Sequence, residues 1–245
     1  AKEFSDIARL ENYGTSAKGR PLFALKISDH VNLDENEPKL MFTSATHGDE
    51  LITVEVQMSL VEELLRSYSS EPRLKRMIEE NQLYFIPVVN PDGFSKRSRY
   101  SSGRVDPNRD YPWPKKPNRV NKVTCIKHLM NFYNKHDFSG SMDIHASGKM
   151  IMFPWAYTRK SIANSDFKFM DNLTTSMAKT NNYKHGPISK VIYVAKGSSA
   201  DYYYWKNNGV ALAIELTTSK VPASSKIPLV VDEARAMIWQ FIEAF

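Results

Sequence analysis

At Ser44-Ala45-Thr46-His47-Gly48-Asp49-Glu50 the hydrophobic pattern of the chain changes from that of a strand to that of a helix. A buried strand is expected at 39–46, and apolar residues recur at helical spacing at about 50–68. His47 and Glu50 stand three residues apart at this junction, so an imidazole and a carboxylate can converge on one point. Such a convergence suits a metal ion.

The same alternation of strands and helices continues along the chain. Further strands are expected at 22–28, 82–89, 141–145, 149–154, 191–195 and 210–217, and helices at 118–133, 161–180, 200–207 and 231–245. The strand at 210–217 is the most apolar and is expected to be central. This order predicts an α/β fold, a three-layer sandwich of helices around a mixed, mostly parallel central sheet. The stretch 94–117 has no period, and a loop of that length in a compact domain is usually functional or disordered.

Composition narrows the class of protein. Apolar residues make up 42% and charged residues 24% of the 245 residues, which is typical of a globular chain, and we expect a single domain over 1–245. No apolar run is long enough to span a bilayer, so no membrane is expected as a partner. The net charge of +6 is spread along the chain, which argues against nucleic acid. The single cysteine, Cys125, excludes an internal disulfide. We expect a monomer that is secreted or periplasmic.

Polar residues that follow expected strands are the candidates for chemistry, because active groups of open α/β sheets gather at the carboxyl ends of strands. His47, Glu50 and His145 form a set of three ligands that leaves a fourth zinc position free. Asp143 stands two residues before His145, on the same face of the strand, and can accept the second ring N–H of that histidine. A zinc site is therefore predicted.

Glu215 is a charge inside the apolar strand Ala211-Leu212-Ala213-Ile214-Glu215-Leu216. An unpaired carboxylate in such a place costs several kcal/mol, so it must be paired in a salt bridge or face a polar cavity. The functional interpretation is a general base with a raised pKa, which takes a proton from water and delivers it to a leaving nitrogen.

The chain resembles the zinc metallocarboxypeptidases of the carboxypeptidase A type, in a compact, bacterial-like form. Six motifs carry the resemblance, in order: His47-Gly48-Asp49-Glu50, Asn90-Pro91-Asp92-Gly93-Phe94, Val105-Asp106-Pro107-Asn108-Arg109, Asp143-Ile144-His145, Tyr193 before Gly197-Ser198-Ser199-Ala200-Asp201-Tyr202, and Ile214-Glu215-Leu216. The resemblance implies that one Zn²⁺ is held by His47, Glu50 and His145. It also implies that Glu215 is the catalytic glutamate.

Further roles follow from the same resemblance. Asn108 and Arg109 match the pair that grips the terminal carboxylate of the substrate, a task that suits the guanidinium fork. Tyr193 matches the mobile tyrosine that closes over that end. Arg99 matches the arginine that stabilises the oxyanion, with Arg97 and Arg104 as competitors. Ala200 occupies the floor of the specificity pocket, and its small neutral side chain selects neither basic nor acidic residues.

The implied function is hydrolysis of the C-terminal amide bond of a peptide with a free C-terminal carboxylate, by Glu-assisted attack of zinc-bound water. Murein stem peptides are one substrate class to consider. The alternative is a deacylase of N-acyl amino acids, of the aspartoacylase or succinylglutamate desuccinylase type, which shares the His-x-x-Glu, Asn-Arg and distant His motifs. The loop that carries Tyr193 favours the peptidase.

Overall fold

Three buried strands form the middle of the computed structural model, which describes residues 1–245. They are β3 (Lys39–Ser44), β5 (Gly140–Ala146) and β8 (Val210–Leu216), and neighbours among them pair in parallel. Every residue of β5 is buried, including Ser141, Asp143 and His145, so the strand is covered on both faces. Their carboxyl ends therefore lie together along one edge of the sheet.

The full sheet has eight strands in the order β1-β2-β4-β3-β5-β8-β6-β7. On one side of the middle strands lie β1 (Ala8–Thr15), β2 (Pro21–Ile27) and β4 (Gln82–Ile86), and on the other lie β6 (Met150–Phe153) and β7 (Lys184–Pro187). Four of the seven strand pairs are parallel. The predicted mixed, mostly parallel sheet is confirmed.

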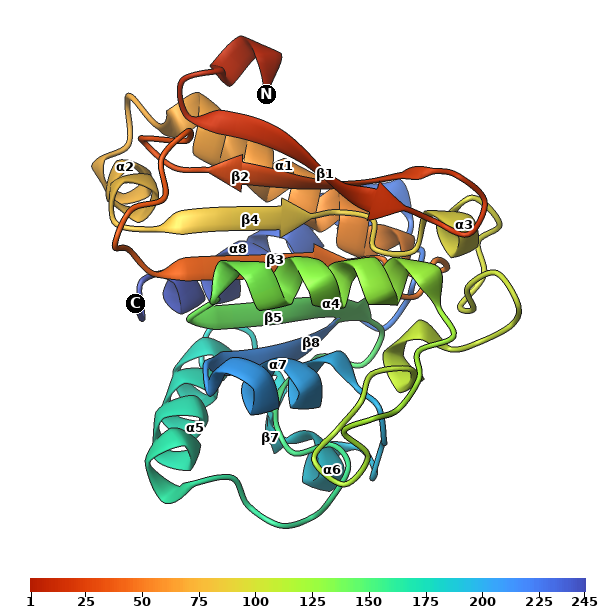
Figure 1. Cartoon of the computed structure of the whole chain (residues 1–245). Coiled ribbons are helices and arrows are strands. Elements are labelled where there is room, and N and C mark those ends of the chain that lie inside the picture. The colour runs from red at the N-terminus through yellow and green to blue at the C-terminus, as the bar shows by residue number, and fades with distance from the viewer.

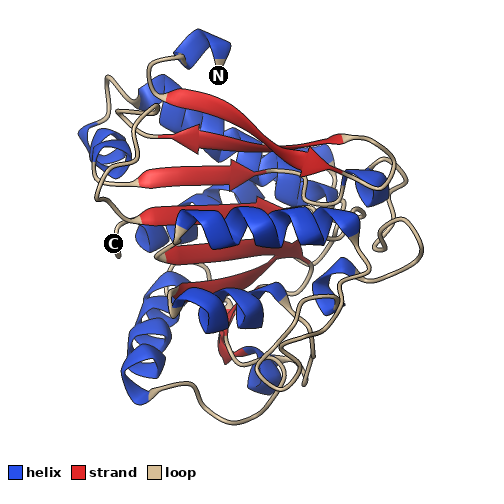
Figure 2. Ribbon diagram, viewed as in Figure 1, coloured by secondary structure: helices blue, strands red, loops and turns tan.

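Helices cover both faces of the sheet, which gives the predicted three layers (Figure 1). One face carries α4 (Thr124–His136) and α7 (Ser199–Asn207), and the other carries α1 (Leu51–Ser67) and α8 (Ile227–Ile242). Figure 2 shows these helices with long loops at the right-hand end of the strands. A cluster of 55 buried apolar residues fills the space between sheet and helices. No helix is long and apolar enough to cross a membrane.

The remaining helices are peripheral. They are α2 (Pro72–Glu79), α3 (Pro91–Phe94), α5 (Asn164–Ala178) and α6 (Ile188–Val191), with 3₁₀ helices at Lys2–Phe4, Pro107–Arg109 and Ser224–Lys226. Of these, the 3₁₀ helix Pro107–Arg109 lies inside the long loop that the sequence left without a period.

The prediction of a strand at 191–195 was wrong. That segment begins as the last residue of α6 and continues as a loop, while the strand of this region is β7, four residues earlier in the chain. Val191 and Ile192 pack instead on a small apolar cluster beside the sheet, and Tyr193 is 55% exposed. β1 and α2 were not predicted at all.

The helix expected at 118–133 begins only at Thr124. The buried carboxylate of Asp110 accepts the backbone N–H groups of Lys122 and Val123, at 2.8 and 2.9 Å. These bonds hold the backbone before Thr124 outside the helix. The helix therefore starts where the long loop ends.

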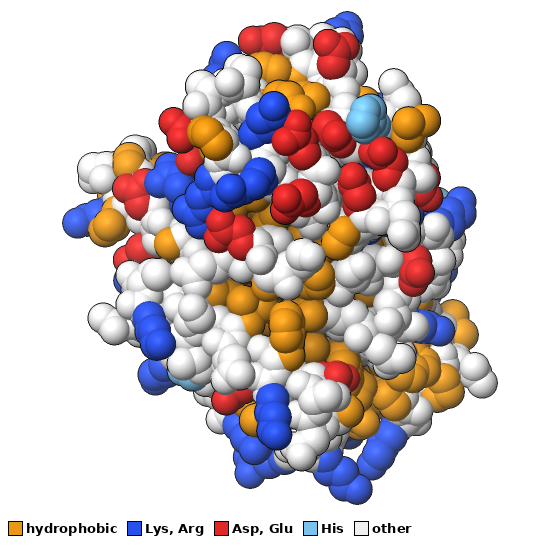
Figure 3. Space-filling model, turned by 90° about the vertical axis from the view of Figure 1, so that its left-hand side faces the viewer, with side chains coloured by type: hydrophobic (Ala, Val, Ile, Leu, Met, Phe, Trp, Pro, Cys, Tyr) orange, Lys and Arg blue, Asp and Glu red, His pale blue; other side chains and the backbone are white.

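The face at the amino ends of the parallel strands carries charges of both signs. Figure 3 shows acidic side chains gathered around a histidine, with a group of basic side chains next to them. In the loop before β3, ligand-type atoms of Asp29, His30 and Glu35 lie within 4.8 Å of one another, and His30 is exposed. This mixture differs from a continuous basic surface.

Candidate active site

The junction between β3 and α1 is held in place by a close backbone approach. A Cβ atom at Gly48 would lie 2.1 Å from the carbonyl carbon of Gly93, so only glycine lets this loop pack on the turn after β4. The turn itself is fixed by Asn90, whose side-chain oxygen accepts the N–H of Gly93 at 3.0 Å. Two of the recognised motifs are therefore a single packed unit that positions His47 and Glu50.

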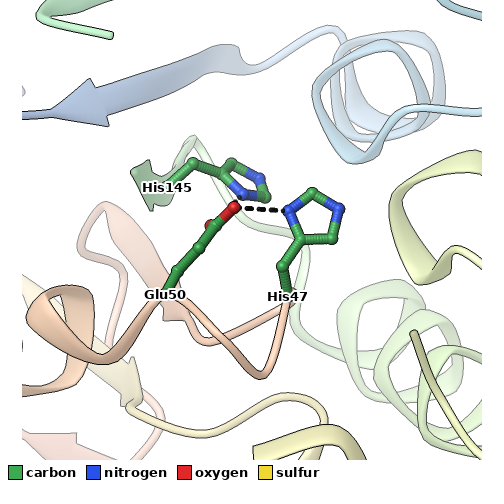
Figure 4. Close-up of side chains that lie close together, drawn as sticks. All are labelled: His47, Glu50 and His145. Atoms are coloured by element: carbon green, nitrogen blue, oxygen red, sulfur yellow. Dashed lines mark hydrogen bonds and ion pairs between the residues drawn. The ribbon is translucent and has the colours of Figure 1, made fainter. Parts of the chain in front are cut away.

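His47, Glu50 and His145 meet at the carboxyl ends of β3 and β5 (Figure 4). The Nδ1 atom of His47 lies 2.9 Å from Glu50 Oε1, and the Nδ1 atom of His145 lies 3.0 Å from Glu50 Oε2. All three side chains are buried, and their ligand atoms lie within 4.8 Å of one another. The three side chains that the sequence predicted as ligands thus come together.

Each histidine also has a carboxylate at its other ring nitrogen. Asp143 Oδ2 lies 2.9 Å from His145 Nε2, as the spacing within β5 predicted. Asp106 Oδ1 lies 3.1 Å from His47 Nε2, a contact that the sequence analysis did not foresee. Both arrangements fix the ring so that Nδ1 faces the centre, which is how outer carboxylates orient metal-binding histidines.

Asp143 is itself held on all sides. Thr43 and Thr46 donate their hydroxyls to its Oδ1 at 2.8 and 3.1 Å, and Ser199 donates to its Oδ2 at 2.5 Å. Ser199 is the first residue of α7, so this carboxylate ties the helix to the ligand strand. The network rigidifies His145.

These contacts shift the pKa values of the carboxylates downward. Burial alone would raise the pKa of Glu50, but the charges and hydrogen bonds of His145 and His47 outweigh it and hold that pKa well below its usual range. Asp106 follows the same pattern, with His47 and Arg99 overcoming burial. Both groups are therefore anions at neutral pH, as a cation site requires.

Arg99 is the only one of the three candidate arginines that lines the cavity at this centre. Its Nη1 lies 3.3 Å from His47 Nδ1, and its Nη2 and Nε donate to Asp106 Oδ2 at 2.9 and 3.1 Å. Arg97 and Arg104 are exposed on the same loop. Of the three candidate arginines, Arg99 is therefore the one that lies at the metal-binding residues.

Glu215 is the direct cross-strand neighbour of His145 in the β5–β8 pairing. Its Oε2 atom is buried without a hydrogen-bond partner, and the side chain lines the same cavity as His47 and His145. Burial raises its pKa, although the charge of His145 opposes the shift. Of the two interpretations left open by the sequence, the structure shows the carboxylate facing the cavity and not a buried salt bridge.

The cavity beside Glu215 has a volume of about 100 Å³. Its apolar lining residues belong to one small cluster, and they are Met152, Ile188, Ile192, Ala195, Ala200 and Ala213. Ala200 thus lies in the wall that the family resemblance assigned to specificity. Lys196, which lies close by in the sequence, does not line the cavity.

Arg109 and Tyr193 line the cavity and contact each other. Arg109 Nη2 donates to the hydroxyl of Tyr193 at 2.9 Å, and the guanidinium lies 5.8 Å from the centre of the ring. A Cβ atom at Gly197 would lie 2.5 Å from the carbonyl oxygen of Arg109, and φ there is +80°. The loop that carries Tyr193 can therefore pack on the Arg109 segment only through glycine.

Asn108 links the two halves of the site. Its Oδ1 accepts the backbone N–H of Ser199 at 2.8 Å, and its Nδ2 lies 3.0 Å from His145 Nε2. The side chain is buried and fixed between α7 and the ligand strand. Sequence comparison with the family gave it a role in substrate binding, and the contacts add a structural link.

The donor set fits a zinc ion. Two imidazole Nδ1 atoms and one carboxylate face a common point, each histidine has an outer carboxylate, and the cavity opens on one side of the group. Two nitrogens and one oxygen with an open side are the usual ligands of catalytic zinc. The carboxylates Glu50, Asp106 and Asp143 also supply the negative charge that a divalent cation needs.

Comparison with known proteins agrees with this donor set. The zinc carboxypeptidase family, Peptidase_M14, matches residues 1–237, and the chain belongs to that family. It is 26% identical over 96% of its length to carboxypeptidase SOL1 of Arabidopsis thaliana, and 23% identical over 99% to carboxypeptidase D of Mus musculus. The match spans 51% and 20% of those two proteins.

A solved structure shares the fold. The carboxypeptidase A of Helicoverpa armigera superimposes with a TM-score of 0.86 at 20% identity, over 100% of this chain and 70% of that one. The family is one of zinc enzymes, so zinc is the metal that His47, Glu50 and His145 are placed to hold.

Proposed function

We propose that the protein is a zinc-dependent metallocarboxypeptidase that removes one residue from the C-terminus of a peptide. The observation that carries the proposal is the set of groups that line one cavity. The ligand histidines, Glu215 and Arg109 line it together with neutral apolar side chains. A substrate that ends in a carboxylate and an uncharged side chain fits this set.

Arg109 would bind the terminal carboxylate. In the structure its Nη2 donates to Tyr193, and a carboxylate offers the guanidinium two stronger, charge-assisted acceptors in place of one phenol oxygen. Tyr193 is 55% exposed and can then close over the bound residue. Asn108 holds this segment against α7 because its side-chain oxygen accepts the backbone N–H of Ser199.

Glu215 would act as the general base. Its Oε2 has no competing partner, and its raised pKa makes it better able to take a proton from the attacking water and return it to the leaving nitrogen. Bound zinc would supply Lewis acidity, which polarises the scissile carbonyl and makes water more acidic. Arg99, held by Asp106, would donate to the oxyanion that forms.

The side chain that the cavity prefers is proposed to be apolar. The apolar part of its lining consists of Met, Ile and Ala side chains, and Ala200 belongs to that cluster. A charged C-terminal side chain would lose hydration there without a partner, which costs free energy. Murein stem peptides remain one proposed substrate class, because the guanidinium recognises a carboxylate whatever the linkage before it.

A panel of substrates tests the proposal. The zinc-loaded protein would be incubated with peptides that end in Leu, Lys or Glu, with the same peptides as C-terminal amides, with murein stem peptides and with N-acyl amino acids, and products identified by mass spectrometry. We expect loss of one C-terminal residue from the free acids, fastest for Leu, and none from the amides. Cleavage confined to the N-acyl amino acids would establish the deacylase instead.

A further inference from the structure

A second cavity, of about 310 Å³, lies behind the loop that carries Arg99. It is an open, surface-accessible cavity, lined by Asp92, by Lys18 from the turn after β1 and by residues of the segment 96–104, and its cations are exposed. None of the residues that line it also lines the cavity of the active site. It is therefore a separate site on the other side of the same loop.

Three cations line this cavity and none has a carboxylate partner. Lys18, Lys96 and Arg104 form no salt bridge within 4.0 Å. The one carboxylate in the wall, Asp92, is already engaged: it accepts the hydroxyl of Ser16 and the guanidinium of Arg20, each at 2.8 Å. The cavity consequently carries an excess of positive charge.

Two of these cations, Lys18 and Lys96, line the same cavity. The positive charge of Lys96 lowers the pKa of Lys18. Like charges held together are unfavourable unless an anion lies between them. The arrangement thus lacks a negatively charged partner.

The loop also supplies neutral donors. Ser98 and Ser102 line the cavity, and the Ser98 oxygen accepts the backbone N–H of Tyr100 at 3.2 Å, which leaves its own proton to donate outward. The turn that presents Arg104 is closed by its backbone N–H to the carbonyl of Ser101, at 3.1 Å. Charged and hydroxyl donors therefore surround one space.

We propose that this cavity binds a phosphate-class oxyanion, free or as a monoester, through Lys18, Lys96 and Arg104. Three cations match the two negative charges and several acceptor oxygens of such a group better than the single charge of a carboxylate. The volume exceeds what a bare anion fills, which leaves room for the organic part of an ester.

Calorimetric titration of the zinc-loaded protein tests the site. Inorganic phosphate and glycerol 3-phosphate are the two probes, and they distinguish a site for the free ion from one that accepts an ester. Because Arg109 is a second anion-binding group, all titrations are made in the Arg109→Gln background. We expect about one equivalent of at least one probe to bind.

Variants at the surface of the cavity locate the binding. Lys96→Gln and Arg104→Gln should each weaken it about tenfold, and the double variant should abolish it. The matched control is Arg97→Gln, which removes an exposed charge from the same loop but does not line the cavity. No binding of either probe, binding that survives in the double variant, or an equal loss in Arg97→Gln would overturn the proposal.

Discussion

Two carboxylates in the active site, Glu50 and Glu215, lie close to each other but differ in their hydrogen-bond partners and in the direction of their pKa shifts. Glu50 lies within hydrogen-bond distance of both ligand histidines and accepts the backbone N–H of Ala146, and its pKa is lowered. Glu215 lies on the neighbouring strand, has a buried oxygen without a partner, and has a raised pKa. Both side chains are largely buried, so burial is not what separates them.

The difference lies in the partners. At the metal site each ligand histidine is held by an outer carboxylate and Glu50 contacts both histidines, which suits groups that must stay fixed. Glu215 has no such partner at its buried oxygen, which suits a group that must gain and lose a proton. Substitutions that change either the metal site or Glu215, but not both, test this difference.

The largest effect is expected for Glu215→Gln. It removes the base but keeps the shape, so kcat should fall by about 100- to 10,000-fold while zinc content and the circular dichroism spectrum stay unchanged. Glu80→Gln, at an exposed glutamate without an ion pair, is the control and should retain full activity. Normal hydrolysis by Glu215→Gln would show that Glu215 is not the general base.

Arg99→Gln should have the next largest effect. Loss of one oxyanion donor typically costs about 100- to 1,000-fold in kcat, and the guanidinium here is the only one of the three candidates at the cavity. Arg97→Gln should change kcat little. Steady-state kinetics on a peptide substrate compare the two variants. Equal losses of kcat would mean that the positive charge of the loop, and not the position of Arg99, matters for the rate.

Asp143→Asn tests the metal-binding site alone. Weakening the carboxylate that holds His145 should lower zinc affinity by about 10- to 100-fold, measured by competition with a chelator, and kcat at saturating zinc should suffer less. Asp106→Asn should act in the same direction through His47. Unchanged zinc affinity in both variants would show that the outer carboxylates do not brace the ligands.

The smallest effect is expected in the pH dependence of kcat/KM. Because burial raises the pKa of Glu215, the base becomes protonated as pH falls through a value above about 4.3, the ordinary pKa of Glu, and kcat/KM should decline there. Stability has the opposite sign: a carboxyl with a raised folded pKa loses stabilising free energy as pH rises. Glu215→Gln should therefore unfold at a higher temperature relative to the wild type at neutral pH than at acid pH. An acid limb at or below the ordinary pKa would contradict the raised pKa.

The sequence alone predicted most residues of the metal-binding site. His47 and Glu50 are close in the chain, and Asp143 and His145 lie two apart on one strand, so local periodicity was enough to place them. The contact of Asp106 with His47, 59 residues away, depends on how the long loop folds back, and no local pattern carries that information.

The errors in the predicted secondary structure also come from contacts that are distant in the sequence. The segment 191–195 has strand-like residues, but they pack on an apolar cluster beside the sheet, and a neighbouring segment takes the place in the ladder. β1 was missed because its alternation is weak, with only Ala8 fully buried. Tertiary packing overrode local propensity at both places.

The most direct test of the central claim is removal and return of zinc. The purified protein would be assayed for hydrolysis of a peptide that ends in Leu, with its zinc content measured in the same samples. We predict that a strong chelator abolishes hydrolysis while the fold is retained, and that activity returns in proportion to zinc up to one ion at the site of His47, Glu50 and His145. Full hydrolysis by the zinc-free protein would contradict the account.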